Sequence, residues 1–65
     1  MILTQGEGRA LLVVEGDETV GSITPLAQFL WRALRPDGTE VGQGYATAQA
    51  AGRALVFASR LRYGS

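Results

Sequence analysis

The sequence predicts an α+β fold: a small antiparallel sheet of three to four strands with one C-terminal helix packed on one face. Residues 35–39 read Arg-Pro-Asp-Gly-Thr and divide two short segments. Pro pre-sets φ, Asp accepts a hydrogen bond from the backbone two residues on, and Gly adopts positive φ, so a tight reversal is expected there. An alanine-rich run with helical periodicity follows the second segment. The chain therefore reads as a single domain, residues 1–65, in which a β-hairpin leads into a helix.

Residues 9–15 predict the first strand, after a loose lead-in over residues 1–8. The apolar run over residues 10–14 is too short for an independent helix and is β-branched at its end. Its apolar side chains fall on both faces of the strand, with Leu12 and Val14 on the same side. Because one helix covers only one side of a sheet, we expect the other side to meet a second copy or a different protein.

Residues 19–24 predict a second strand that carries an irregularity. Val20 and Ile23 are out of phase for simple alternation, and Gly21 lies between them. This pattern is typical of a strand with a β-bulge.

The sequence of residues 25–35 is compatible with either a helix or a strand. Apolar residues recur at helical spacing from Leu26 to Leu34, and Pro25 suits a first helical position. The same residues also fit the two-residue alternation of a β-strand. In addition, Pro36 disfavours the α conformation of Arg35, the residue before it. We predict strands over residues 28–35 and 39–46, and the alternative is a ββαβα arrangement with a helix over residues 25–35. The strand pairing sets Trp31 opposite Gln43 and gathers these residues on one face: Phe29, Trp31, Ala33, Val41 and Tyr45.

Residues 47–62 predict the helix, with Thr47 as its cap. At 100° per residue, most of the apolar side chains gather on one arc that includes Phe57 and Leu61, and Val56 falls on the opposite, polar side. The predicted core residues are therefore Leu12, Trp31, Leu55, Phe57 and Leu61.

Length and composition favour a protein that associates with itself. A chain of 65 residues supports only a small core, and with no Cys and no His it has neither disulfides nor a typical zinc site. We expect a homo-oligomer, most simply a dimer. Residues 1–26 hold four acidic residues against one arginine and residues 27–65 hold five arginines against two acidic residues, so the halves carry −3 and +3. No apolar run reaches the ~20 residues that span a bilayer, and a secretory signal pattern is lacking, so we expect a cytoplasmic location and no membrane contact.

The chain lacks the residues that carry most enzyme chemistry. Without His or Cys, the commonest general base and thiol nucleophile are missing, so we expect no enzymatic activity and no catalytic residue. Gly42 and Gly44 lack the third glycine and the lysine of phosphate-binding loops, so no cofactor is expected and a bulge explains them better. Glu15, Asp17 and Glu18 would make at best a weak calcium site, and no metal is expected.

These exclusions leave a small non-enzymatic protein-interaction module. We expect it to bind a second copy, another protein, or both, with Leu12, Val14 and Val56 as the candidate interface. Small cysteine-free proteins of this kind are often encoded by phages and other mobile elements and modulate a host protein, and that origin is one hypothesis here. The alternative is a nucleic-acid-binding protein that contacts phosphates through arginines of a sheet or helix face, the candidates being Arg32, Arg35, Arg53 and Arg60.

Overall fold

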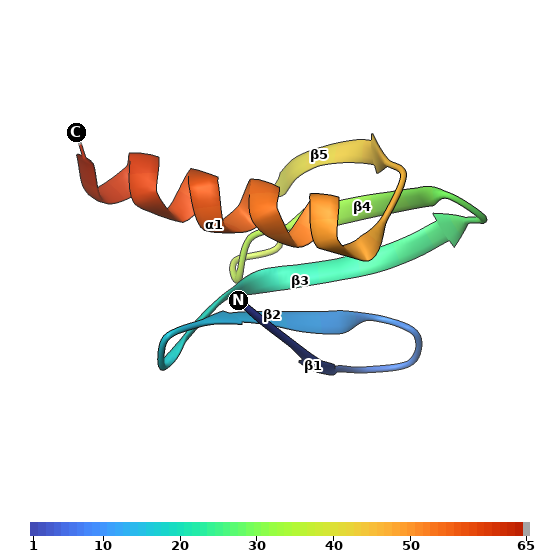
Figure 1. Cartoon of the computed structure of the whole chain (residues 1–65), viewed down its shortest axis with the longest axis horizontal. Helices are drawn as coiled ribbons and strands as arrows, with labels where there is room; N and C mark the ends of the chain where they lie inside the picture. Colours follow the sequence, from blue (N-terminus) through green and yellow to red (C-terminus); the bar gives the residue numbers. More distant parts are fainter. Residues whose placement is uncertain (65) are drawn as a thin grey trace.

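The chain forms a five-stranded antiparallel sheet and one C-terminal helix (Figure 1). The computed structural model describes residues 1–64, and the side chains of residues 1–61. The strands lie in chain order, β1-β2-β3-β4-β5, and α1 lies across one face of the sheet. The α+β class is therefore confirmed. The elements are β1 (Ile2–Gln5), β2 (Leu11–Glu15), β3 (Glu18–Ala27), β4 (Leu30–Leu34), β5 (Glu40–Tyr45) and α1 (Ala48–Gly64).

The sheet has one strand more than the three to four predicted, and the additional strand is β1. Residues 1–8, expected to be a loose lead-in, contain β1, which pairs with β2 from Ile2 opposite Val14 to Gln5 opposite Leu11. The four residues of β1 show no alternation of their own. The partner strand supplies the backbone hydrogen bonds and the apolar neighbours, so the pairing is visible only in the tertiary structure.

The helix alternative for residues 25–35 is wrong. Pro25 lies within β3 opposite Trp31, and β4 is bonded on both sides, to β3 and to β5. Those two ladders satisfy the backbone of β4 and outweigh the helical spacing of its apolar residues. Phe29 forms the turn between β3 and β4 with a φ of 59°, and its side chain is 71% exposed. It therefore does not join the face on which it was predicted.

The reversal at residues 35–39 forms as predicted. Gly38 N–H donates to the carbonyl oxygen of Arg35 at 2.9 Å, and Gly38 has a φ of 91°. The N–H of Thr39 donates to Oδ1 of Asp37, also at 2.9 Å. Asp and Gly therefore act in the turn as their positions in the sequence indicated.

The β4–β5 pairing reaches the predicted face through a different register. Trp31 lies opposite Tyr45, where the sequence predicted Gln43, because the register shifts twice along β5. Gly44, with a φ of 88°, provides one of the two irregularities. Four of the five residues predicted to share a face do pack on the core: Trp31, Ala33, Val41 and Tyr45.

The helix is capped as predicted but rotated about its axis. Thr47 accepts a hydrogen bond from the N–H of Ala50 through its side-chain oxygen at 3.1 Å. The side turned to the sheet holds small residues and Leu55, while Phe57 and Leu61 are 64% and 60% exposed. The prediction of Phe57 and Leu61 as core residues was therefore wrong. Apolar residues lie on all sides of this helix, so the periodicity of the sequence does not determine which side is buried. In the structure, the buried side is the one whose small residues fit closely against the sheet.

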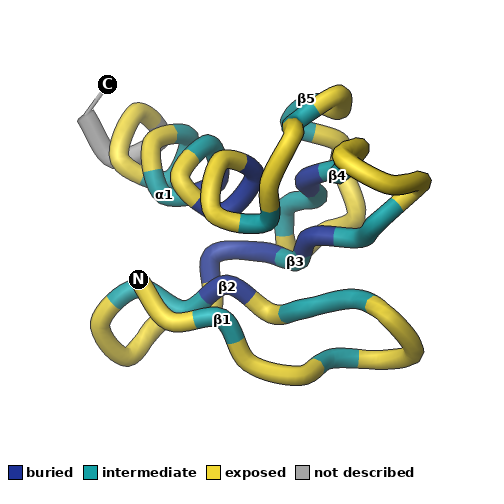
Figure 2. Tube along the Cα trace, turned by 45° about the vertical axis from the view of Figure 1, so that its right-hand side comes forward, coloured by how far each residue is buried: buried dark blue, intermediate teal, exposed yellow. Residues whose placement is uncertain are grey.

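The core lies between α1 and the middle of the sheet (Figure 2). Of the predicted core residues, Leu55 is buried and Trp31 packs against the core, whereas Leu12 lies outside it and is 36% exposed. The predicted bulge in β3 is present, because Val13 pairs with Gly21 and Val14 pairs with Thr19. The fully buried set, with at most 1% exposure, is Val13, Ile23, Ala33, Ala51 and Leu55.

Gly21 lies where β3, the backbone of β4 and Leu55 of α1 come close together. Its φ is 152°, and a Cβ placed there would meet the carbonyl oxygen of Leu34 and the methyl groups of Leu55. Gly16 also has positive φ, at 65°, but a Cβ there would meet nothing within 4 Å. A side chain at either glycine would strain the backbone, but only a side chain at Gly21 would also collide with the core.

We expect Gly21→Ala to destabilise the fold by about 1–3 kcal/mol more than Gly16→Ala, because overpacking adds to the strain of positive φ. Urea unfolding of the two variants measures the difference. Equal losses would mean that neither the backbone of β4 nor Leu55 of α1 crowds β3 at this position.

The buried side of the helix is tested by a pair of truncations. Leu55→Ala is expected to lower the free energy of unfolding by about 2–5 kcal/mol, since it opens a cavity in the core. Phe57→Ala, on the exposed side, is expected to cost less than ~1 kcal/mol. Chemical denaturation measures both, and the reverse order would show that the helix presents its other side to the sheet.

Candidate interaction surface

The sheet has one face that no other described element covers. Successive side chains of a strand point to opposite faces of the sheet. Val13, Ile23 and Ala33 point to α1, so their neighbours in the strands point to the uncovered side, which we call the open face. The helix makes its contacts on the other side, with β2, β3, β4 and β5. The apolar side chains of the open face are Ile2, Leu12, Val14, Leu30 and Leu34.

These side chains are partly accessible to solvent. Ile2 is 58% exposed, Leu12 and Leu30 are 36% exposed, and Val14 and Leu34 are half-buried. Leu12, Ser22 and Leu34 are neighbours across β2, β3 and β4. They line a shallow hollow of about 300 Å³ on this face. The middle of the open face is therefore apolar and slightly concave.

Two of the three predicted interface residues belong to this face. Leu12 and Val14 lie on the open face, next to Ile2 and Thr4 of β1. Val56 packs against the core on the other side of the sheet. The structure therefore does not bring Val56 to Leu12 and Val14, and its predicted place on the polar side of the helix was wrong because the helix is rotated.

The open face also carries a polar group with an unmet hydrogen bond. Arg32 lies opposite Thr24 and Gln43 on this face. Among the described residues, its Nε is buried and has no hydrogen-bond partner. A buried donor without an acceptor costs free energy, so this guanidinium lowers the stability of the single chain.

The four candidate arginines do not form one basic patch. Arg32 lies on the open face, while Arg35 lines a cavity between the 35–39 turn and α1. Arg53 and Arg60 lie on the exposed side of the helix, and Nη2 of Arg60 is 3.5 Å from Oε2 of Glu15. The arginines thus lie on different sides of the molecule, whereas a phosphate-binding surface needs them to converge.

A second exposed apolar feature lies on α1, which the sequence analysis had assigned to the core. Phe57 lines a hollow of about 390 Å³, and the other lining residues are Met1, Glu15, Arg53, Val56 and Arg60. Leu61 follows Phe57 by one helical turn.

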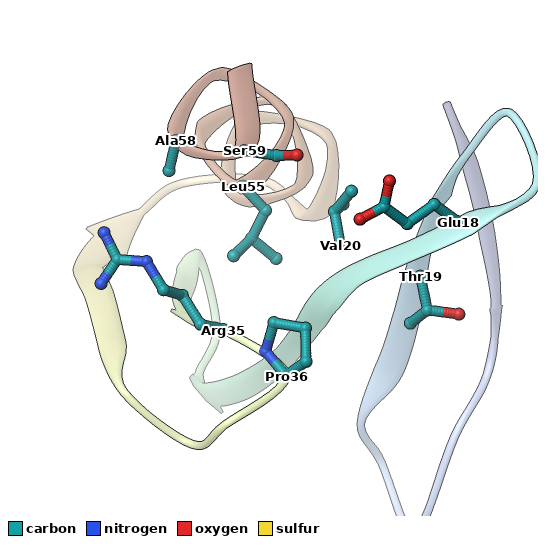
Figure 3. A pocket seen from close by; sticks show the side chains of 8 residues that line it. All are labelled: Glu18, Thr19, Val20, Arg35, Pro36, Leu55, Ala58 and Ser59. Atoms are coloured by element: carbon teal, nitrogen blue, oxygen red, sulfur yellow. The ribbon is translucent and has the colours of Figure 1, made fainter. Parts of the chain in front are cut away.

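The enclosed space under the helix is small (Figure 3). Leu55 points from α1 into the gap between Val20 and Pro36, and the remaining cavity is about 30 Å³. A volume of that size holds a water molecule or two and no organic cofactor. Within residues 1–61, no group of His, Cys, Asp or Glu side chains is arranged to hold a metal ion.

Glu15, one of the acidic residues near the turn after β2, makes two ion pairs. Oε1 of Glu15 lies 3.1 Å from the amino group of Met1, and its other oxygen faces Arg60. The carboxylate of Glu15 thus links the start of β1 to α1.

Comparison with known proteins finds no matching family model, no matching curated protein and no matching solved structure. In the described part of the chain, the helix is neither long nor apolar enough to span a membrane.

Proposed function

We propose that this chain is a small non-enzymatic protein-interaction module that associates with a second copy through the open face. The observation that carries the proposal is the row of partly exposed apolar side chains contributed by β1, β2 and β4. Apolar sheet faces are stable when another layer covers them, and α1 covers only the opposite face.

The order of the strands separates the acidic and basic halves of the sequence across the sheet. Because the strands lie in chain order, the acidic half of the sequence forms β1, β2 and most of β3, and the basic half forms β4, β5 and α1. A two-fold axis along the strands would lay β1 and β2 of one copy over β5 and β4 of the other. Arg32 of the basic half lies on the open face, whereas Arg53 and Arg60 lie on the exposed side of α1. Two sheets packed in this way stand about 10 Å apart.

The size of the face implies weak association. Five strands spaced by about 4.8 Å, each about five residues long, cover on the order of 400 Å² per copy. Two such faces bury less than the ~1,200 Å² that marks a stable specific interface. We therefore expect association between micromolar and millimolar concentrations through this face.

The test is the mass of the protein in solution. We expect the average mass to rise with concentration, and Leu12→Lys to weaken the association at least tenfold, because a lysine in the middle of the face would lose its hydration on docking. Sedimentation equilibrium and light scattering measure the masses. Gln49→Lys, which adds the same charge on the exposed side of α1, is the matched control.

A mass that is unaffected by Leu12→Lys would reject association through the open face. A strict monomer up to millimolar concentration would reject the second copy and leave a different protein as the occupant of this face.

A further inference from the structure

β1 forms one outer edge of the sheet, and its outer backbone groups face no other described strand (Figure 1). In an antiparallel pair, successive residues alternate between those bonded to the neighbour and those whose N–H and C=O point outward. Gly6 N–H donates to the carbonyl oxygen of Ala10 at 2.9 Å, in the register that sets Thr4 opposite Leu12. Alternation from this bond directs the N–H and C=O groups of Leu3 and Gln5 outward.

The two edges of the sheet differ in their protection. β5 is irregular, with two shifts in its register, and it leads directly into α1, which packs beside it. Bulges and covering elements are the usual means of preventing edge pairing. β1 has a regular register and contains no charged residue, no proline and no bulge. The β1 edge is therefore the one open to another strand.

We propose that β1 pairs with β1 of a second copy in antiparallel orientation about a two-fold axis at Thr4. This register sets Leu3 opposite Gln5 of the second copy, and Gln5 opposite Leu3 of the second copy. The outward backbone groups of both Leu3 and Gln5 then find partners, and each Leu3–Gln5 pair between the copies exchanges two hydrogen bonds. Any other two-fold register leaves at least one of the two without a partner within the strand.

The side chains of β1 are compatible with this pairing. Thr4 lies on the open face and would meet Thr4 of the second copy, and Thr–Thr cross-strand pairs are favourable. Leu3 lies on the side of α1, where its methyl groups are next to Gly52. The helix makes most of its contacts with β2, β3, β4 and β5, and it approaches β1 through Gly52 on the face of the sheet rather than at its outer edge (Figure 1).

The pairing would join two five-stranded sheets into one of ten strands. It would also join the two open faces, with Ile2 and Thr4 of both copies at the seam. The joined face covers about twice the area of one copy, on the order of 800 Å². This last consequence rests on the proposed function, whereas the strand pairing itself does not.

Amide hydrogen exchange tests the pairing directly. In the single chain, the N–H groups of Leu3 and Gln5 point to solvent, while that of Thr4 is bonded to β2. We expect the exchange of Leu3 and Gln5 to slow at least tenfold as the protein concentration rises from micromolar to millimolar. A sample that mixes labelled and unlabelled chains should also give a close contact between the Hα atoms of the two Thr4 residues, since Thr4 faces its copy at a position without hydrogen bonds.

Variants separate the edge from the open face. Gln5→Pro removes an outward N–H and leaves the bonds to β2 in place, because proline is tolerated at an edge whose N–H faces solvent. Gln5→Ala keeps the N–H and is the matched control. We expect Gln5→Pro to weaken edge pairing at least tenfold, Gln5→Ala to have little effect, and Leu12→Lys to preserve the protection of Leu3 and Gln5.

Each outcome decides between the two surfaces. If Leu3 and Gln5 exchange at solvent rates in the associated protein, the edge pairing is wrong and association through the open face still stands. If they are protected and Leu12→Lys leaves the mass unchanged, the edge pairing stands and the open-face proposal is wrong. Should Gln5→Pro fail to fold, as seen by circular dichroism, the exchange of the unmodified protein still decides. A strict monomer at millimolar concentration overturns both.

Discussion

The close contact between α1 and β3 at Gly21 is the constraint on which the rest of the structure depends. A residue without a side chain, with a φ of 152°, leaves room for Leu55 against the backbone of β4. The helix presents its small residues around Leu55, and Ala51 is fully buried there. With Leu55 turned to the sheet, Phe57 lies about 200° further around the helix and is therefore exposed. The hydrophobic effect supplies the driving force, but the shape of the contact decides which side chains are buried.

A two-layer fold made from so short a chain has few means of covering the second face of its sheet. One helix follows five strands, so the opposite face keeps apolar side chains such as Leu12 and Leu34 partly in water. Polar neighbours, among them Ser22 and Thr24, keep this face from being a continuous apolar sheet. The same polar neighbours limit how strongly the face of one copy can bind, so a joined surface from two copies has a clear physical advantage.

The two edges of the sheet are finished in different ways, and the difference follows from where the helix attaches. β5 runs directly into α1 and bends toward it through Gly44, which disturbs its register with β4. β1 is far from that junction along the chain and keeps a regular register. The irregular register of β5 thus also hinders another strand from pairing with that edge, while the edge at β1 stays regular and accessible.

The sequence by itself determined the local features of this protein. The turn at residues 35–39, the Thr47 cap, the bulge near Gly21 and the α+β class were all predicted, because each depends on residues close together in the chain. The first strand, the register of β5 and the buried side of α1 were decided only by the tertiary structure. β1 needs β2 as a partner, and the rotation of α1 depends on the space that Gly21 leaves. Alternation is local, so the sequence placed Leu12 and Val14 on the same side of their strand, but it predicted Leu12 both as a core residue and as an interface residue. Val56 was misplaced because the orientation of the helix depends on the tertiary structure.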